Sequence, residues 1–67
     1  MTVREFVKEY NVNIKRCSVE YEDGSTPRGF IYETDKEHKR LFDKYYGDME
    51  VDYAYNDEYG YCIIIVK

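Results

Sequence analysis

A short apolar run near the C-terminus constrains the fold more than any other feature of this sequence. The run consists of Tyr61, Cys62, Ile63, Ile64, Ile65 and Val66. Successive side chains of a strand point to opposite faces of a sheet, and a strand that is apolar at both parities is typical of burial on both faces. We therefore expect a strand whose second face is covered by a copy of the chain, by a binding target, or by a central position in a strongly curved sheet.

The length of the chain leaves room for a single small domain spanning residues 1–67. At 67 residues, a domain buries only about 60% of the surface that its unfolded chain exposes, which leaves little room for both a core and a deep substrate cleft. Nine tyrosines contribute to an apolar content of 43%. Two cysteines are too few for a disulfide-dense mini-protein, and the aromatic and β-branched residues are too many for disorder. The apolar run is also far shorter than the roughly 20 residues of a membrane span.

Two segments have the spacing of short amphipathic helices. Residues 2–10 begin with a capping box made by Thr2 and Glu5, and apolar residues follow at helical spacing on one face. A second capping box, from Thr34 to Glu37, begins a helix that Gly47 ends. Helices this short are marginal alone, so we expect both to dock on a sheet.

Four segments have the pattern of strands, at residues 12–21, 28–33, 48–55 and 61–66. The alternation in the first slips at Lys15 and Arg16, where we expect a bulge or a break. In the third, apolar residues alternate with acidic ones and are expected to share one face. These apolar residues are Met49, Val51, Tyr53 and Tyr55. The order αββαββ predicts an α+β fold in which a four-stranded antiparallel sheet carries two short helices on one face.

The two halves of the chain share a weak internal repeat. An offset of 36 residues aligns six identical residues, including Arg4 with Arg40 and Phe6 with Phe42. A duplicated αββ unit, residues 2–33 and 34–67, is one interpretation. The other is that two amphipathic helices share a composition because both need the same apolar spacing.

The net charge of −4 lies wholly in the last twenty residues. Residues 1–47 carry equal numbers of basic and acidic side chains, whereas residues 48–67 carry five carboxylates against Lys67. Such a segment repels phosphate and attracts basic surfaces, so we expect no direct nucleic-acid binding there. A basic stretch on the second helix is interleaved with acidic residues and is typical of a solvated, ion-paired face. It consists of Lys36, Lys39, Arg40 and Lys44.

The sequence holds no recognisable catalytic or metal-binding pattern. The single histidine, His38, has no nucleophile signature around it, and the loop at residues 24–29 lacks the ending of a phosphate-binding loop. Asp48, Glu50 and Asp52 would be spaced too widely on a flat strand to share one cation. We therefore expect a protein that is not an enzyme and that uses no cofactor and no metal.

The N-terminal residues show no apolar segment of the kind that directs export. This predicts a cytoplasmic protein without a membrane partner. In a reducing compartment Cys17 and Cys62 are expected to be free thiols, although a bridge between them would close a long loop.

An acidic, tyrosine-rich segment is the sharpest candidate for a binding site. Alternate strand residues repeat at about 6.6–6.8 Å, of the order of the spacing of successive phosphates, so Asp48, Glu50 and Asp52 would present a phosphate-like row to a basic groove. Neighbouring tyrosines would add rigid contact area. The expected partner-binding residues are Asp48, Glu50, Asp52, Tyr53, Tyr55, Asp57, Glu58 and Tyr59. The alternative is a solvated strand face beside tyrosines that fill a thin core.

In size, acidity and tyrosine content the chain resembles the small inhibitor proteins of phages and mobile elements, a class that includes anti-CRISPR proteins. The resemblance covers residues 48–61 and the overall length, and it is to the class, without a family motif. Some members of that class resemble nucleic acid in charge. The resemblance implies a non-enzymatic protein-binding module that inhibits a nucleic-acid-handling protein by occupying its basic groove.

The alternative is a protein of a different class, a small homodimeric structural or accessory protein. It would pair through the C-terminal strand, with Ile63, Ile64 and Ile65 covering an otherwise exposed sheet.

Overall fold

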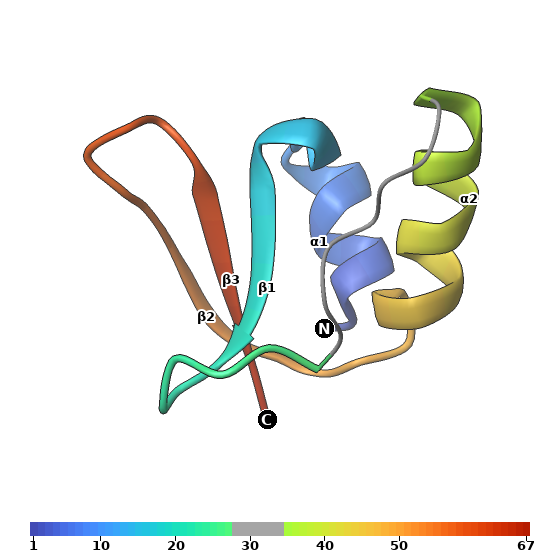
Figure 1. Ribbon diagram of the computed structural model, residues 1–67. Coiled ribbons are helices and arrows are strands. Elements are labelled where there is room, and N and C mark those ends of the chain that lie inside the picture. The colour runs from blue at the N-terminus through green and yellow to red at the C-terminus, as the bar shows by residue number, and fades with distance from the viewer. Residues whose placement is uncertain (28–34) are drawn as a thin grey trace.

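In the computed structural model, two helices lie on one side of a three-stranded sheet (Figure 1). The structure describes residues 1–27 and 35–67. The elements are α1 (Val3–Glu9), the short 3-10 helix η1 (Ile14–Arg16), β1 (Cys17–Tyr21), α2 (Asp35–Tyr46), β2 (Val51–Asn56) and β3 (Cys62–Val66). The strand expected over residues 28–33 and the capping box expected at Thr34 lie outside the described residues.

The sheet has the strand order β1-β3-β2, with β1 parallel and β2 antiparallel to β3. The expectation of a four-stranded antiparallel sheet is therefore wrong, although the α+β class is right. A parallel neighbour needs a long crossover, usually with a helix, and α2 lies in the chain between β1 and β3. The duplicated αββ unit stays a prediction, because the second strand of its first copy lies outside the described residues.

The first helix forms for the local reason that the sequence gives. The Thr2 hydroxyl accepts a hydrogen bond from the Glu5 amide at 3.2 Å, and the Glu5 carboxylate accepts one from the Thr2 amide at 2.9 Å. These bonds satisfy amide groups that the first turn of a helix leaves free. Backbone bonds from Val3 to Met49 and from Val51 to Met1 then fasten the N-terminus to the start of β2. Among the described residues, no helix combines the length and apolar character needed to cross a membrane.

The irregularity expected near Lys15 and Arg16 is confirmed as a break. Residues 14–16 form η1, whose first turn is capped by the Asn13 side chain, which accepts from the Lys15 amide at 3.1 Å. The strand begins only at Cys17, so the expected strand over residues 12–21 is too long at its N-terminal end.

The core lies between the helices and the facing side of the sheet. Its buried members are Val3, Val19, Phe42, Tyr46, Ile64 and Val66. The C-terminal apolar run forms β3, which is central in the sheet because it is hydrogen-bonded to a strand on each side. Whether a copy of the chain or a binding target covers its second face stays a prediction.

A β-bulge in β2 moves the side chains that follow it to the opposite face of the sheet from the one that strict alternation predicts. The register with β3 shifts between Val51 and Tyr53, so that Val51 and Ala54, three positions apart, both pack against the core. Tyr53 and Tyr55 alternate with Ala54 and face away from the helices. The expectation that Met49, Val51, Tyr53 and Tyr55 share one face is therefore wrong.

Candidate partner-binding face

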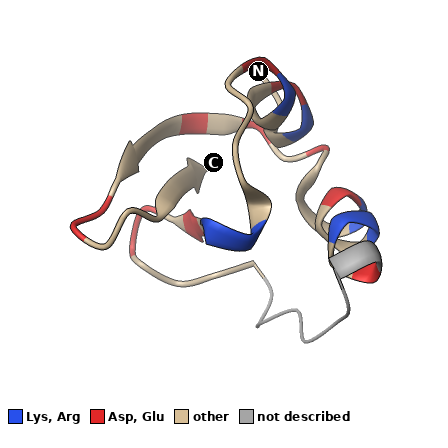
Figure 2. Ribbon diagram, turned by 90° about the horizontal axis from the view of Figure 1, so that it is seen from above, with Lys and Arg blue, Asp and Glu red and all other residues tan. Residues whose placement is uncertain are grey.

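The side of the sheet that faces away from α1 and α2 is the candidate binding surface, and we call it the open face. The register aligns its side chains in two rows across the three strands. One row is Ser18, Ile63 and Tyr55, and the other is Glu20, Ile65 and Tyr53. In the view of Figure 2, both helices lie to one side of the sheet and leave this face without a helix over it.

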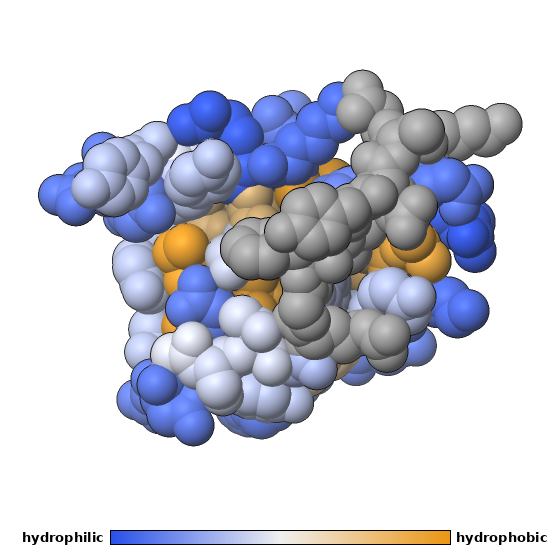
Figure 3. Space-filling model, viewed as in Figure 1, coloured by the Kyte–Doolittle hydropathy of each residue, from blue (hydrophilic) through white to orange (hydrophobic). Residues whose placement is uncertain are grey.

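Each row has an isoleucine at its centre. Ile63 and Ile65 are only 7% and 4% exposed although neither α1 nor α2 covers them. On β2, Tyr53 and Tyr55 stand beside them with their rings stacked at 6.5 Å between centroids, and they are 46% and 50% exposed. Figure 3, in the same view as Figure 1, shows apolar residues set among polar ones on the side of the molecule that carries the edge strand β1. The open face therefore presents two half-exposed phenol rings beside two buried isoleucines.

Three carboxylates form the rim of the open face: Glu20 lies in the row of Tyr53, and Glu22 and Asp52 lie close enough to Tyr53 to affect its pKa. Burial, together with the negative charges of Glu22 and Asp52 and the adjacent Tyr55, raises the pKa of Tyr53. Glu20 accepts a hydrogen bond from the Ser18 hydroxyl at 2.9 Å. No ion pair recorded between described residues involves Glu22 or Asp52. This rim carries negative charge that is available to an outside cation.

The row of carboxylates expected at Asp48, Glu50 and Asp52 does not form. β2 begins at Val51, so Asp48 and Glu50 precede the strand, and the bulge separates Asp52 from them. Asp48 accepts from Nη1 of Arg4 at 2.6 Å, and Glu50 accepts from the N-terminal amine at 2.9 Å. Two of the three carboxylates are thus paired within the chain, which removes the phosphate-like spacing.

The turn between β2 and β3 holds the other acidic and aromatic residues expected at the site. Asp57 Oδ1 accepts from the amides of Tyr59 at 2.9 Å and Tyr61 at 2.8 Å, so Asp57 serves the turn. Glu58 and Tyr59 are exposed. Arg16 donates from Nη2 to the Tyr59 carbonyl at 2.9 Å and places its guanidinium 4.8 Å from the centre of the Tyr61 ring. The turn is therefore held by hydrogen bonds, and the guanidinium of Arg16 lies beside it.

The basic residues expected on the second helix lie on α2, on the other side of the molecule from the open face. Arg40 donates to Glu37 at 2.6 Å, and Lys39 and Lys44 are exposed. The side chain of Lys36 lies outside the described residues. The ion pair agrees with a solvated, mixed-charge helix surface.

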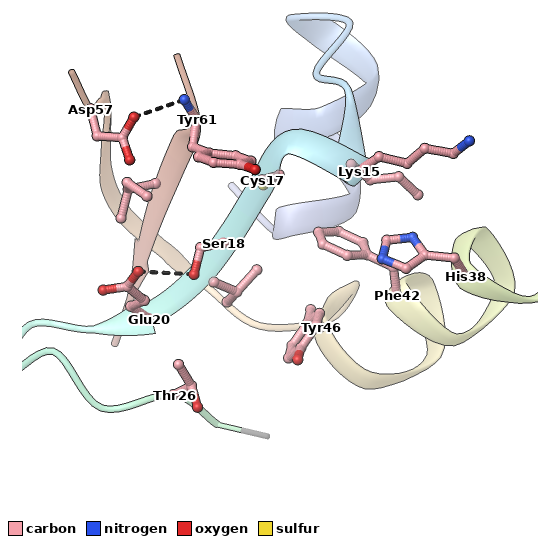
Figure 4. A pocket seen from close by; sticks show the side chains of 13 residues that line it. Lys15, Cys17, Ser18, Glu20, Thr26, His38, Phe42, Tyr46, Asp57 and Tyr61 are labelled. Carbon is pink, nitrogen blue, oxygen red and sulfur yellow. Dashed lines mark hydrogen bonds between the residues drawn. The ribbon is translucent and has the colours of Figure 1, made fainter. Parts of the chain in front are cut away.

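A cavity of about 550 Å³ beside β1 is a feature that the sequence did not suggest (Figure 4). His38 and Phe42 of α2 line one side, with ring centroids 6.2 Å apart, and Ser18 and Glu20 of β1 line another. Within the described part of the chain, Nδ1 of His38 is buried without a hydrogen-bond partner. The Ser18 hydroxyl donates to Glu20, so the serine and the histidine form no nucleophile–base pair.

Among the described residues, no group of three or more His, Cys, Asp or Glu side chains is arranged to hold a metal ion.

The open face includes Ser18, Glu20 and Glu22, which were not expected as site residues. Alternation along the strand could have predicted this, because it places Ser18 and Glu20 on the other face of the sheet from Cys17, Val19 and Tyr21. Comparison with protein-family models, curated proteins and solved structures gave no match for this chain.

Proposed function

We propose that this protein is a non-enzymatic protein-binding module that docks a basic surface of its partner against the open face. The stacked pair of Tyr53 and Tyr55, half exposed beside buried Ile63 and Ile65, is the observation that carries the proposal. Tyrosines presented in this way supply large rigid contact areas, and they are enriched where protein interfaces concentrate their binding energy.

The sign of the charge at the rim supports a basic partner. Glu20 lies on the open face, Glu22 and Asp52 lie close enough to Tyr53 to raise its pKa, and the chain has a net charge of −4. Complementary charge increases the rate of association and selects among partners more than it increases affinity. We expect the partner to present lysines or arginines around an apolar or aromatic contact.

A nucleic-acid-handling protein, inhibited through its phosphate-binding groove, is the specific form of this proposal. Such a groove is basic and attracts an acidic protein of this size. The net charge supports this form, whereas the paired Asp48 and Glu50 give it no phosphate-like row. The rim of the open face takes the place of that row.

The experiment is capture of partners from cell lysate on the immobilised protein at low and at high salt, quantified by mass spectrometry. Tyr53→Ala with Tyr55→Ala should abolish capture of the specific partners. Glu22→Gln with Asp52→Asn should weaken their capture at low salt and flatten its salt dependence, because exposed charges are screened by ions.

The matched control is Asp48→Asn with Glu50→Gln, which removes the same amount of charge from carboxylates already paired within the chain. This variant should retain most of the capture. Equal capture by the wild type and by the tyrosine and rim variants would contradict the proposal.

The strand order limits which surface could form the interface of a homodimer. β3 is hydrogen-bonded to β1 and β2, so it offers no free edge, and Ile64 lies fully within the core. Only Ile63 and Ile65 face the open side, so a dimer would have to form face to face. Sedimentation across a dilution series tests it, since a monomer at all concentrations would contradict it.

A further inference from the structure

The two cysteines of the chain meet in the sheet although they are far apart in sequence. Cys17 and Cys62 are the first residues of β1 and β3 and are direct partners in the parallel register. Both are free thiols, both are half-buried, and both pack against the core on the helix side of the sheet. None of the functions considered above uses this pair.

The backbone spacing at this position suits a disulfide. Neighbouring strands lie about 4.7–4.9 Å apart, and disulfides form between residues whose Cα atoms are roughly 4.4–6.8 Å apart. Cys62 is also paired with Asn56 of β2, so the sheet fixes its backbone on both sides and holds it opposite Cys17. A bond here would cross-link the edge strand β1 to the central strand β3.

The two thiols differ in acidity, and this sets the order in which they react. Burial, followed by the nearby Cys62, raises the pKa of Cys17 to about 12, so Cys17 is protonated at neutral pH before Cys62 reacts. Burial also raises the pKa of Cys62, but the hydrogen bond from Cys17 opposes that rise. Because the thiolate is the nucleophile in thiol chemistry, Cys62 is the thiol of the pair that reacts first.

An approach to Cys62 is open from the side of α1. A groove of about 380 Å³ reaches it, with Phe6 and Tyr10 of α1 and the guanidinium-bearing Arg16 among its lining residues. The positive charge of Arg16 favours an anionic reagent in this groove. A small peptide disulfide that carries carboxylates, such as glutathione disulfide, fits that chemistry.

We propose that Cys17 and Cys62 form a reversible intramolecular disulfide by exchange with a low-molecular-weight disulfide such as glutathione disulfide. The Cys62 thiolate attacks one sulfur of glutathione disulfide, which forms a mixed disulfide and releases one glutathione thiolate. Cys17 then loses its proton to water or to the released thiolate, attacks the Cys62 sulfur and displaces the second glutathione. The protein loses two hydrogen atoms, and glutathione disulfide gains them as two glutathione molecules.

The bond would stabilise the pairing of β1 with β3. In the described residues β1 is hydrogen-bonded to β3 alone, so it is an edge strand. Cross-linking residues 17 and 62 reduces the number of conformations open to the unfolded chain. This lowers the unfolding equilibrium constant by up to about 10³-fold. In a reducing compartment the pair stays open, and oxidising conditions close it.

The test equilibrates the full chain with glutathione redox buffers, quenches with acid and counts free thiols by alkylation and mass spectrometry. The expected product is a monomer two hydrogens lighter, with no remaining thiol and a higher thermal unfolding midpoint that a reductant reverses. The effective concentration of the two thiols should be at least about 100-fold higher in the folded protein than in concentrated urea, because the fold aligns them.

Single substitutions test the order of the two thiols. Cys17→Ser should accumulate the mixed disulfide of Cys62 with glutathione, whereas Cys62→Ser should react more slowly because Cys17 is the less acidic thiol. Two glutathione adducts per chain, disulfides between chains, or an effective concentration no higher in the folded protein than in urea would each overturn the proposal. The wild-type comparison decides it even where a serine variant fails to fold.

Discussion

At the scale of single residues, burial and internal pairing separate the side chains that hold the fold from those that can bind a partner. Ile64 is completely buried in the core, and Asp57 is engaged by two amides of its turn. Tyr53 and Tyr55 contact each other but remain half exposed. This difference predicts which substitutions affect stability and which affect binding.

Ile64→Ala should destabilise the protein by about 3 kcal/mol, because it removes buried methyl and methylene groups from the centre of a small core and leaves a cavity. Urea unfolding followed by circular dichroism measures the loss. Tyr59→Ala, at an exposed position of the turn, is the control and should cost less than about 0.5 kcal/mol. Equal losses for the two variants would contradict the placement of β3 at the centre of the sheet.

Asp57→Ala should cost about 1–2 kcal/mol, because the Tyr59 and Tyr61 amides lose their side-chain acceptor. Asp57→Asn keeps one carbonyl oxygen in place and should lose less than Asp57→Ala. The same urea unfolding measurement compares them. An equal loss for the two variants would show that the charge, and not the turn bonds, matters at this position.

At the scale of elements, charged contacts hold the two helices and the start of β2 together. Arg4 of α1 donates to Asp43 of α2 at 2.6 Å and to Asp48 at 2.6 Å. These hydrogen bonds raise the pKa of Arg4 and lower that of Asp43. The capping contacts with Thr2 similarly lower the pKa of Glu5.

Stability should therefore fall in acid. The pKa values of Asp43 and Glu5 lie below their ordinary values of 3.8 and 4.5 in the folded protein, so their contribution is present above those values and is lost as the pH falls through the lower, folded ones. Urea midpoints between pH 7 and pH 2.5 should decline below about pH 4.5. Asp43→Asn should be less stable than the wild type at pH 7 and should decline less in acid.

The matched control is Asp52→Asn, whose carboxylate makes no recorded ion pair with a described residue. Its acid decline should follow the wild type. The same decline in the Asp43 variant and in the wild type would show that the Arg4 contact does not link the helices.

At the scale of the whole molecule, local features were predictable from the sequence and pairings between distant segments were not. The capping box of α1 depends on Thr2 and Glu5 alone, and the break before β1 follows from the slip at Lys15 and Arg16. The parallel pairing of Cys17 with Cys62 depends on the path of the chain between them, which alternation along one strand does not encode.

The face on which the acidic, tyrosine-rich segment lies was mispredicted because of one extra residue in β2. A bulge between Val51 and Tyr53 puts Tyr53 and Tyr55 on the open face, whereas strict alternation put them beside Val51. A shift of one residue exchanges the two faces of a strand. The acidic and aromatic character of the segment was therefore predictable, but the surface on which it lies was not.

The central claim is that the open face is the surface that binds a partner. The most direct measurement is an NMR comparison of backbone and side-chain shifts of this protein, free and with a purified partner recovered by the capture experiment. We predict that the changes concentrate at Ser18, Glu20, Tyr53 and Tyr55. Changes confined to α1 and the exposed side of α2, with the open face unaffected, would contradict the claim.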